Sequence, residues 1–178
     1  MPQFEPRLDI LPAAQREIWP SLAAARRLKF VLYGGTAIAL QLGHRESVDF
    51  DFFCTEGLDK ERIRAEFSFI ADAVILQDAP DTLVVLAEMP SGPVKVSFFG
   101  GLKIGRVNDP LETADGVLLV ASLDDLMATK IKATLDRAGL PGHRRHAVRG
   151  RFAADGTKCL QGDVSGRARA GIASAGVL

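Results

Sequence analysis

Short apolar runs separated by turn residues fill the middle of the chain. They occupy residues 29–33, 49–54, 73–77, 82–88 and 94–99, and a shorter run occupies 117–120. The segments D-A-P-D at 78–81 and P-S-G-P at 90–93 carry the Asp, Pro and Gly residues that favour turns. The pattern predicts a strand at each run, and residues 94–99 alternate cleanly between two faces.

Helical segments flank these strands. Residues 11–28 are rich in Ala and Leu, and Pro20 divides them into two pieces because proline interrupts the helical hydrogen bonding. Residues 36–42 and 58–67 predict shorter helices. Residues 122–138 predict the clearest helix, which opens with S-L-D-D, a capping box with Ser122 as the N-cap and Asp125 at the third helical position. Strands clustered between helices predict an α+β fold with a mixed sheet.

Composition narrows the class of protein. A chain of 178 residues with 47% hydrophobic content predicts one domain with a real core. Two cysteines, Cys54 and Cys159, predict no disulfide framework and suit a reducing compartment. The first residues lack the basic and apolar regions of a signal peptide, and no apolar run approaches the length of a membrane span. We therefore expect a cytoplasmic protein.

The most informative motif is Gly34-Gly35-Thr36, followed by Asp49-Phe50-Asp51. A glycine pair between a strand and a helix lets the backbone approach a ligand, and a helix N-terminus favours a phosphate. Successive strand residues point to opposite faces, so Asp49 and Asp51 share a face. Two carboxylates on an apolar strand favour a hard cation such as Mg²⁺. An ordinary tight turn followed by an edge strand is the structural alternative.

These motifs carry a family resemblance, which covers roughly residues 28–138. The turn and the D-x-D pair resemble the first motif of the DNA polymerase β-like nucleotidyltransferases. Together with H-R-E-S-V-D-F-D-F-F, V-K-V-S-F-F and D-D-L-M-A-T-K-I-K-A, they resemble the AbiEii/AbiGii-type toxin nucleotidyltransferases. The resemblance implies a polymerase β-like core, a cation (Mg²⁺ or Mn²⁺) on Asp49 and Asp51, and an NTP substrate. It also implies a cognate antitoxin as partner.

Other site residues follow from the same comparison. Members of the superfamily carry a third carboxylate on a later strand, where this chain has Ser97, and Glu88 is a possible stand-in. Lys95 shares the face of Ser97, and both are assigned to nucleotide binding; Lys95 could equally be a solvated strand lysine. Arg45 is placed to contact phosphate or to neutralise nearby carboxylates.

Lys130 is the remaining catalytic candidate. At 100° per residue it lies about 40° from Leu126, within an apolar stripe that includes Leu123 and Met127. A lysine there must extend to solvent or reach a negative partner. The resemblance favours the second reading, because a D-x-x-x-x-K motif in the toxin family faces the nucleotide. We therefore expect Lys130 to point toward Asp49 and Asp51.

Residues 139–178 differ from the rest. This segment holds seven Lys or Arg and two Asp or Glu, many glycines and no sustained period, which predicts a basic tail of low order. We therefore expect a core at 1–138 and a tail at 139–178. The family continues into an R-D-x-x-D motif. DNA that encodes G-L-P-G-H-R-R-H-A can also encode this motif when it is read one base later. A +1 frameshift near Ala138 is the leading explanation.

Competing chemistry is not indicated. The chain lacks G-x-x-x-x-G-K-[ST], G-x-G-x-x-G and G-x-S-x-G, and His143 and His146 have no further ligands at zinc spacing. The resemblance thus predicts an enzyme that transfers NMP from an NTP to an acceptor hydroxyl on RNA or protein, as the toxin of a toxin–antitoxin or phage-defence pair. The alternative is a truncated or degenerate remnant that only binds nucleotide or antitoxin.

Overall fold

A mixed eight-stranded sheet organises the described part of the chain. The computed structural model describes residues 1–102 and 105–137. The sheet order within these residues is β1-β7-β8-β2-β3-β6-β5-β4, with parallel pairing of β1 with β7, β2 with β8 and β3 with β6. The strands are β1 (Gln3–Phe4), β2 (Val31–Tyr33), β3 (Asp49–Phe53), β4 (Val74–Ala79), β5 (Thr82–Met89), β6 (Gly92–Phe99), β7 (Leu111–Thr113) and β8 (Leu119–Val120).

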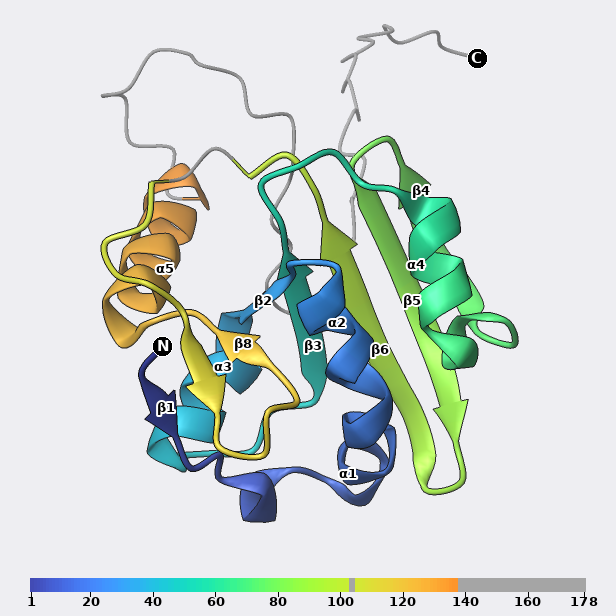
Figure 1. The fold of residues 1–178 in the computed structure, drawn as a ribbon, viewed down its shortest axis with the longest axis horizontal. Helices are drawn as coiled ribbons and strands as arrows, with labels where there is room; N and C mark the ends of the chain where they lie inside the picture. Colours follow the sequence, from blue (N-terminus) through green and yellow to red (C-terminus); the bar gives the residue numbers. More distant parts are fainter. Residues whose placement is uncertain (103–104, 138–178) are drawn as a thin grey trace, which may run out of the picture.

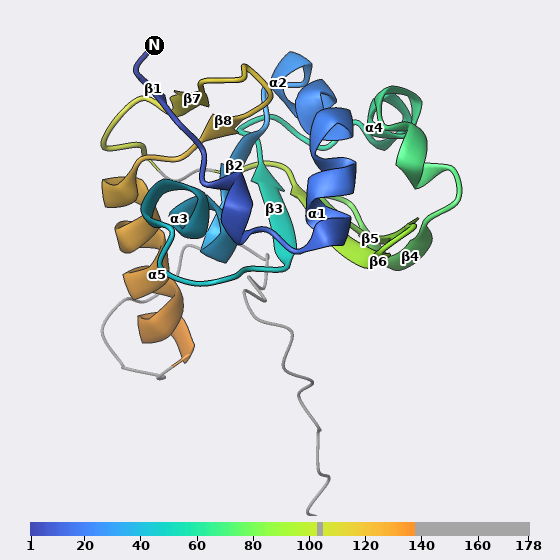
Figure 2. The same ribbon diagram turned by 90° about the horizontal axis from the view of Figure 1, so that it is seen from below.

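Helices cover one face of the sheet and one end of it. Helices α1, α2 and α4 lie over a common face, whereas α3 and α5 lie together near β2 and β8 (Figures 1 and 2). The α-helices are α1 (Ala13–Ile18), α2 (Ala24–Arg27), α3 (Gly34–Leu42), α4 (Lys60–Glu66) and α5 (Leu123–Arg137). Three 3₁₀ helices, η1 (Leu8–Ile10), η2 (Trp19–Ala23) and η3 (Ser68–Ile70), complete the described elements.

The core lies between the sheet and helices α1, α2 and α4. Phe50 and Phe52 of β3 and Phe98 of β6 are fully buried on this face. Phe98 packs against Phe52 with ring centroids 5.7 Å apart, and Phe50 contacts Trp19 of η2 at 6.3 Å. The alternation of β3 and β6 therefore places large apolar side chains on one face and leaves the other face for polar residues.

The sequence predictions agree with the α+β fold and its mixed sheet. Pro20 does divide the N-terminal helical region, since it lies in η2 between α1 and α2. Strands β1 and β7 were not predicted, because each has only two or three residues and they pair with each other across more than 100 residues of sequence. The expected tail at 139–178 lies outside the described residues, so the division of the chain at residue 138 stays a prediction.

Strand β4 forms one edge of the sheet. It pairs with β5 on one side, and its register shifts between Ile75 and Gln77. Val74, Ile75 and Leu76 are each about half exposed. At the other end of the strand, Asp78 forms ion pairs with Lys60 and Arg64 of α4. Among the described helices, none is long and apolar enough to span a bilayer.

Candidate functional site

The glycine turn brings the end of β2 against β3. Helix α3 begins directly at Gly34, whose φ of +79° is a conformation that favours glycine. A Cβ atom on Gly34 would lie 2.6 Å from Oδ2 of Asp51, so any other residue would also displace that carboxylate. Asp51 therefore packs directly against the turn, as its pairing opposite Tyr33 requires.

Asp49 and Asp51 lie on the face of β3 opposite Phe50 and Phe52. The parallel pairing with β6 sets Asp49 beside Lys95 and Asp51 beside Ser97. The Lys95 ammonium donates to Asp49 Oδ2 at 2.7 Å, and both side chains are about one-quarter exposed. The register thus brings four of the predicted site residues to one surface.

Arg45 and Ser47 lie over the first turn of α3. A Cβ atom on Gly35 would meet Arg45 Nη2 and Ser47 Oγ, each at 3.0 Å. Within the described part of the chain, no side chain accepts a hydrogen bond from the first backbone N–H groups of this helix. A guanidinium beside such N–H groups suits an anion such as phosphate. Ser47 was missed from the sequence, although it continues the alternation of Asp49 and Asp51.

Thr36 does not present its hydroxyl to a ligand in this structure. Its side chain is fully buried, and its hydroxyl donates to the backbone carbonyl of Asp49. The same hydroxyl lies 2.9 Å from Ser47 Oγ. Thr36 therefore ties the start of α3 to the start of β3. A contact from this residue to phosphate would come from its backbone N–H.

Among the residues that the structure describes, the third carboxylate of the superfamily pattern has no counterpart beside Asp49 and Asp51. Ser97 is buried at 2% exposure and lies between Asp51 on β3 and Val84 on β5. Glu88 of β5 pairs with Pro93, whereas Lys95, the neighbour of Asp49, pairs with Leu86. Glu88 is therefore two strand spacings and two residues away from Asp49, a separation of about 12 Å. Within residues 1–102 and 105–137, no group of three or more metal-binding side chains occurs.

The expected phase of α5 is wrong. Leu126 is buried, but Leu123 and Met127, which defined the supposed apolar stripe, are 41% and 62% exposed. Lys130 is exposed as well and lines a surface pocket of about 220 Å³ with Ile131, Thr134 and Leu135. The buried face of α5 instead carries Ser122, Asp125 and Leu126, because the loop before β7 packs against it.

Asp125 acts as a structural anchor. Its backbone N–H donates to Ser122 Oγ at 3.2 Å, which confirms Ser122 as the N-cap. The reciprocal bond differs from that of the predicted capping box, because Asp125 Oδ2 accepts from the Ser122 hydroxyl at 2.7 Å rather than from the Ser122 backbone N–H. Its carboxylate also accepts from the backbone N–H of Val107 at 2.7 Å. Burial opposes ionisation, but these donors together hold the pKa of Asp125 below its usual value of 3.8.

Arg106 is a cation near the turn that the sequence did not reveal. Burial raises the pKa of Tyr33, and the positive charge of the Arg106 guanidinium partly opposes this rise because it favours the phenolate. Tyr33 directly precedes Gly34, so Arg106 comes close to the same turn. It lies in an irregular loop without periodicity, so no sequence pattern marks it.

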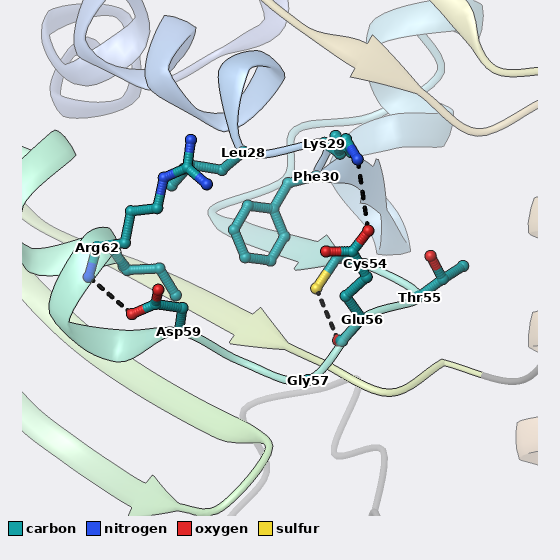
Figure 3. Close-up of a pocket in the computed structure, with 10 residues that line it drawn as sticks. Leu28, Lys29, Phe30, Cys54, Thr55, Glu56, Gly57, Asp59 and Arg62 are labelled. Carbon is teal, nitrogen blue, oxygen red and sulfur yellow. Dashed lines mark hydrogen bonds and ion pairs between the residues drawn. The ribbon is translucent and has the colours of Figure 1, made fainter.

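A separate pocket lies at the other end of β2 and β3. It measures about 70 Å³ and is lined by residues near Lys29, Cys54 and Arg62, as Figure 3 shows. None of the predicted site residues lines it. The Cys54 thiol donates to the Glu56 carbonyl, and burial raises its pKa to about 11, so it is not an activated nucleophile near neutral pH.

Comparison with known proteins assigns a family and a fold to this chain. Residues 21–148 match the family described as "Nucleotidyl transferase AbiEii toxin, Type IV TA system". A solved structure of a proposed nucleotidyltransferase from H. pylori superposes with a TM-score of 0.51 at 16% identity, covering 66% of this chain and 56% of that chain. The chain thus spans little more than half of that protein, and the likeness concerns the fold. No curated protein matches the sequence. Because the family match spans most of its length, the chain belongs to the AbiEii family.

Proposed function

We propose that this protein is a metal-dependent nucleotidyltransferase, the toxin of a cytoplasmic toxin–antitoxin or phage-defence pair. The observation that carries the proposal is the convergence of Asp51, Gly34 and Gly35 with Arg45 within a chain of the AbiEii family. Its substrate is an NTP, and its acceptor is a hydroxyl group on RNA or protein. Its partner is a cognate antitoxin, as the family description implies.

The proposed roles follow from position and charge. Gly34, Gly35 and the N–H of Thr36 receive the triphosphate at the start of α3, and Arg45 neutralises it. Lys95 and Ser97 complete the polar face beside Asp49 and Asp51. The acceptor oxygen bonds to the α-phosphorus, the bond to the bridging oxygen breaks, pyrophosphate leaves, and the hydroxyl proton passes to solvent. Such in-line displacement depends chiefly on positioning and charge neutralisation.

The donor set fits a hard divalent cation. Asp49 and Asp51 share a face, and carboxylate oxygens are the ligands that Mg²⁺ and Mn²⁺ prefer. When bound there, the ion would neutralise charge on the transferred phosphoryl group. Lys130, exposed on a helix that packs against α3, stays in the proposal as a cation that reaches the pyrophosphate from the solvent side.

A transfer assay tests the proposal. The purified full chain is incubated with each α-labelled NTP, Mg²⁺ or Mn²⁺, total RNA and cell protein. We expect covalent label on RNA or on protein, and its loss to background in Asp49→Asn and Asp51→Asn. Asp72→Asn, which changes an exposed carboxylate outside the site, should label normally. Labelling that persists in Asp49→Asn and Asp51→Asn would refute the site.

A second candidate function is binding without turnover. Ser97 stands where the superfamily pattern has a carboxylate, and this specific observation favours a nucleotide- or antitoxin-binding remnant. Mg²⁺-dependent NTP binding that is lost in Asp49→Asn, together with no covalent label on any acceptor, would support this candidate over the enzyme.

A further inference from the structure

The ion pair between Lys95 and Asp49 places a positive charge where the proposed site would use metal. Strands β3 and β6 are parallel neighbours, and the two residues are registered partners on the same face. The 2.7 Å contact between Lys95 Nζ and Asp49 Oδ2 therefore joins two adjacent side chains on the same face of the sheet. Three-quarters of each side chain is shielded from solvent, so the charges interact more strongly than an exposed pair would.

The net charge of the polar face of β3 and β6 limits the number of divalent cations that it can hold. Asp49 and Asp51 contribute two negative charges, and Lys95 removes one of them. Ser97, the neighbour of Asp51, adds a neutral hydroxyl in place of a carboxylate. Sites that hold two divalent ions about 3.5–4 Å apart need enough negative charge between them to offset the repulsion of the ions. The described residues do not supply that charge.

We infer that Lys95 takes the place of a second divalent cation, so that the site binds one such ion with each nucleotide. The inference rests on the proposed function and specifies how the same site works. A lysine ammonium is a compact charge on a flexible stem, and it can donate to Asp49 in the free protein and to a phosphate oxygen when nucleotide is bound. Lys95 thereby lowers the affinity for the metal ion in the free protein and binds a phosphate oxygen of the substrate.

Ion counting tests the inference directly. The full chain is saturated with an NTP analogue that has a methylene bridge between the α- and β-phosphates, and bound Mn²⁺ is counted per bound nucleotide by equilibrium dialysis and electron paramagnetic resonance. We expect one ion in the wild-type chain and two in the double variant Lys95→Met/Ser97→Asp, which frees one carboxylate and adds another. Two ions in the wild-type chain would overturn the inference.

A second measurement does not depend on the folding of the double variant. In the absence of nucleotide, Lys95→Met should bind Mn²⁺ about tenfold more tightly, the size of effect that one neighbouring charge exerts, and should bind the nucleotide analogue more weakly. Lys95→Arg, which keeps the charge, should retain the wild-type Mn²⁺ affinity. Lys60→Met removes a comparable lysine from an ion pair on α4 and should change neither affinity.

The outcomes separate this inference from the proposed function. Unchanged Mn²⁺ affinity in Lys95→Met, with wild-type binding that still requires Asp49, would show an ordinary structural ion pair and overturn the inference alone. Wild-type protein that binds neither Mn²⁺ nor the analogue, or binds both equally well in Asp49→Asn, would overturn the proposed function and the inference with it.

Discussion

The β3–β6 pair and helix α5 distribute their side chains in opposite ways. In the strands, large apolar residues such as Phe52 and Phe98 are buried, and the charged residues Asp49 and Lys95 lie on the more open face. In α5 the polar residues Ser122 and Asp125 are buried. Apart from the buried Leu126, the large apolar residues of α5 are exposed, and they recur every four positions: Leu123, Met127, Ile131 and Leu135.

The difference shows two ways of fixing a functional surface. The strands are held by apolar burial on the far side, which leaves the near face free to carry costly charges. The start of α5 is held by hydrogen bonds from Ser122 and from the backbone of Val107 to one carboxylate. The packing of Phe52 and Phe98 involves no titratable group, whereas the anchorage of α5 should depend on the ionisation of Asp125.

The largest expected effect comes from the buried face of the strands. Phe98→Ala should lower the free energy of unfolding by about 3–5 kcal/mol, because the ring fills the space between Phe30, Phe52 and Phe67. Urea unfolding monitored by circular dichroism measures the loss. The adjacent variant Ser97→Ala, on the other face, should cost about 1 kcal/mol or less. Equal losses of unfolding free energy in the two variants would show that the Phe98 face does not stabilise the strands more than the Ser97 face.

An intermediate effect is expected at the start of α5. Asp125→Asn should cost about 1–3 kcal/mol at pH 7, because it removes the charge from an acceptor of several hydrogen bonds. The pKa of Asp125 is lowered by folding, so its contribution is present above about pH 4 and is lost as the pH falls through the folded-state pKa.

Denaturant titrations of Asp125→Asn and wild type at several pH values between 7 and 3 measure this dependence. The difference in unfolding free energy between the two proteins should shrink toward the acid end. Asp124→Asn, which changes the exposed neighbour, is the matched control and should show a much smaller difference. A difference for Asp125→Asn that stays constant with pH would show that the charge of Asp125 does not anchor the helix.

The smallest effect is expected on the exposed side of α5. Met127→Gln should change the free energy of unfolding by no more than about 0.5 kcal/mol, because the side chain is largely solvated. Leu126→Ala, one residue earlier and fully buried, should cost about 2–5 kcal/mol in the same urea assay. A large loss in Met127→Gln would show that this face is covered in solution.

The same contrast explains what the sequence could predict. A strand has two faces, so alternation alone placed Asp49 with Asp51 and Lys95 with Ser97. The family resemblance brought the two pairs together, and the structure agrees. A helix can turn through any angle, and its apolar stripe gave the wrong phase for Lys130 because loop contacts bury the polar side of α5. Tertiary contacts override the local pattern there.

Residues in irregular segments were beyond the reach of sequence patterns. Arg106 approaches Tyr33 from a loop that no periodicity describes. The role of Thr36 could not be inferred either, since only the fold shows that its hydroxyl donates a hydrogen bond to the backbone carbonyl of Asp49. The position of β1 beside β7 likewise depends on pairing between distant segments of the chain.

The irregular register of β4 has a consequence for behaviour at high concentration. A regular edge strand with half-exposed Val74, Ile75 and Leu76 would be a ready template for sheet extension between molecules. The shift between Ile75 and Gln77 interrupts the even spacing of outward N–H and C=O groups, and the charges of Asp78, Lys60 and Arg64 follow directly. This edge therefore resists pairing with the edge strand of another molecule, even though its exposed apolar side chains favour such pairing.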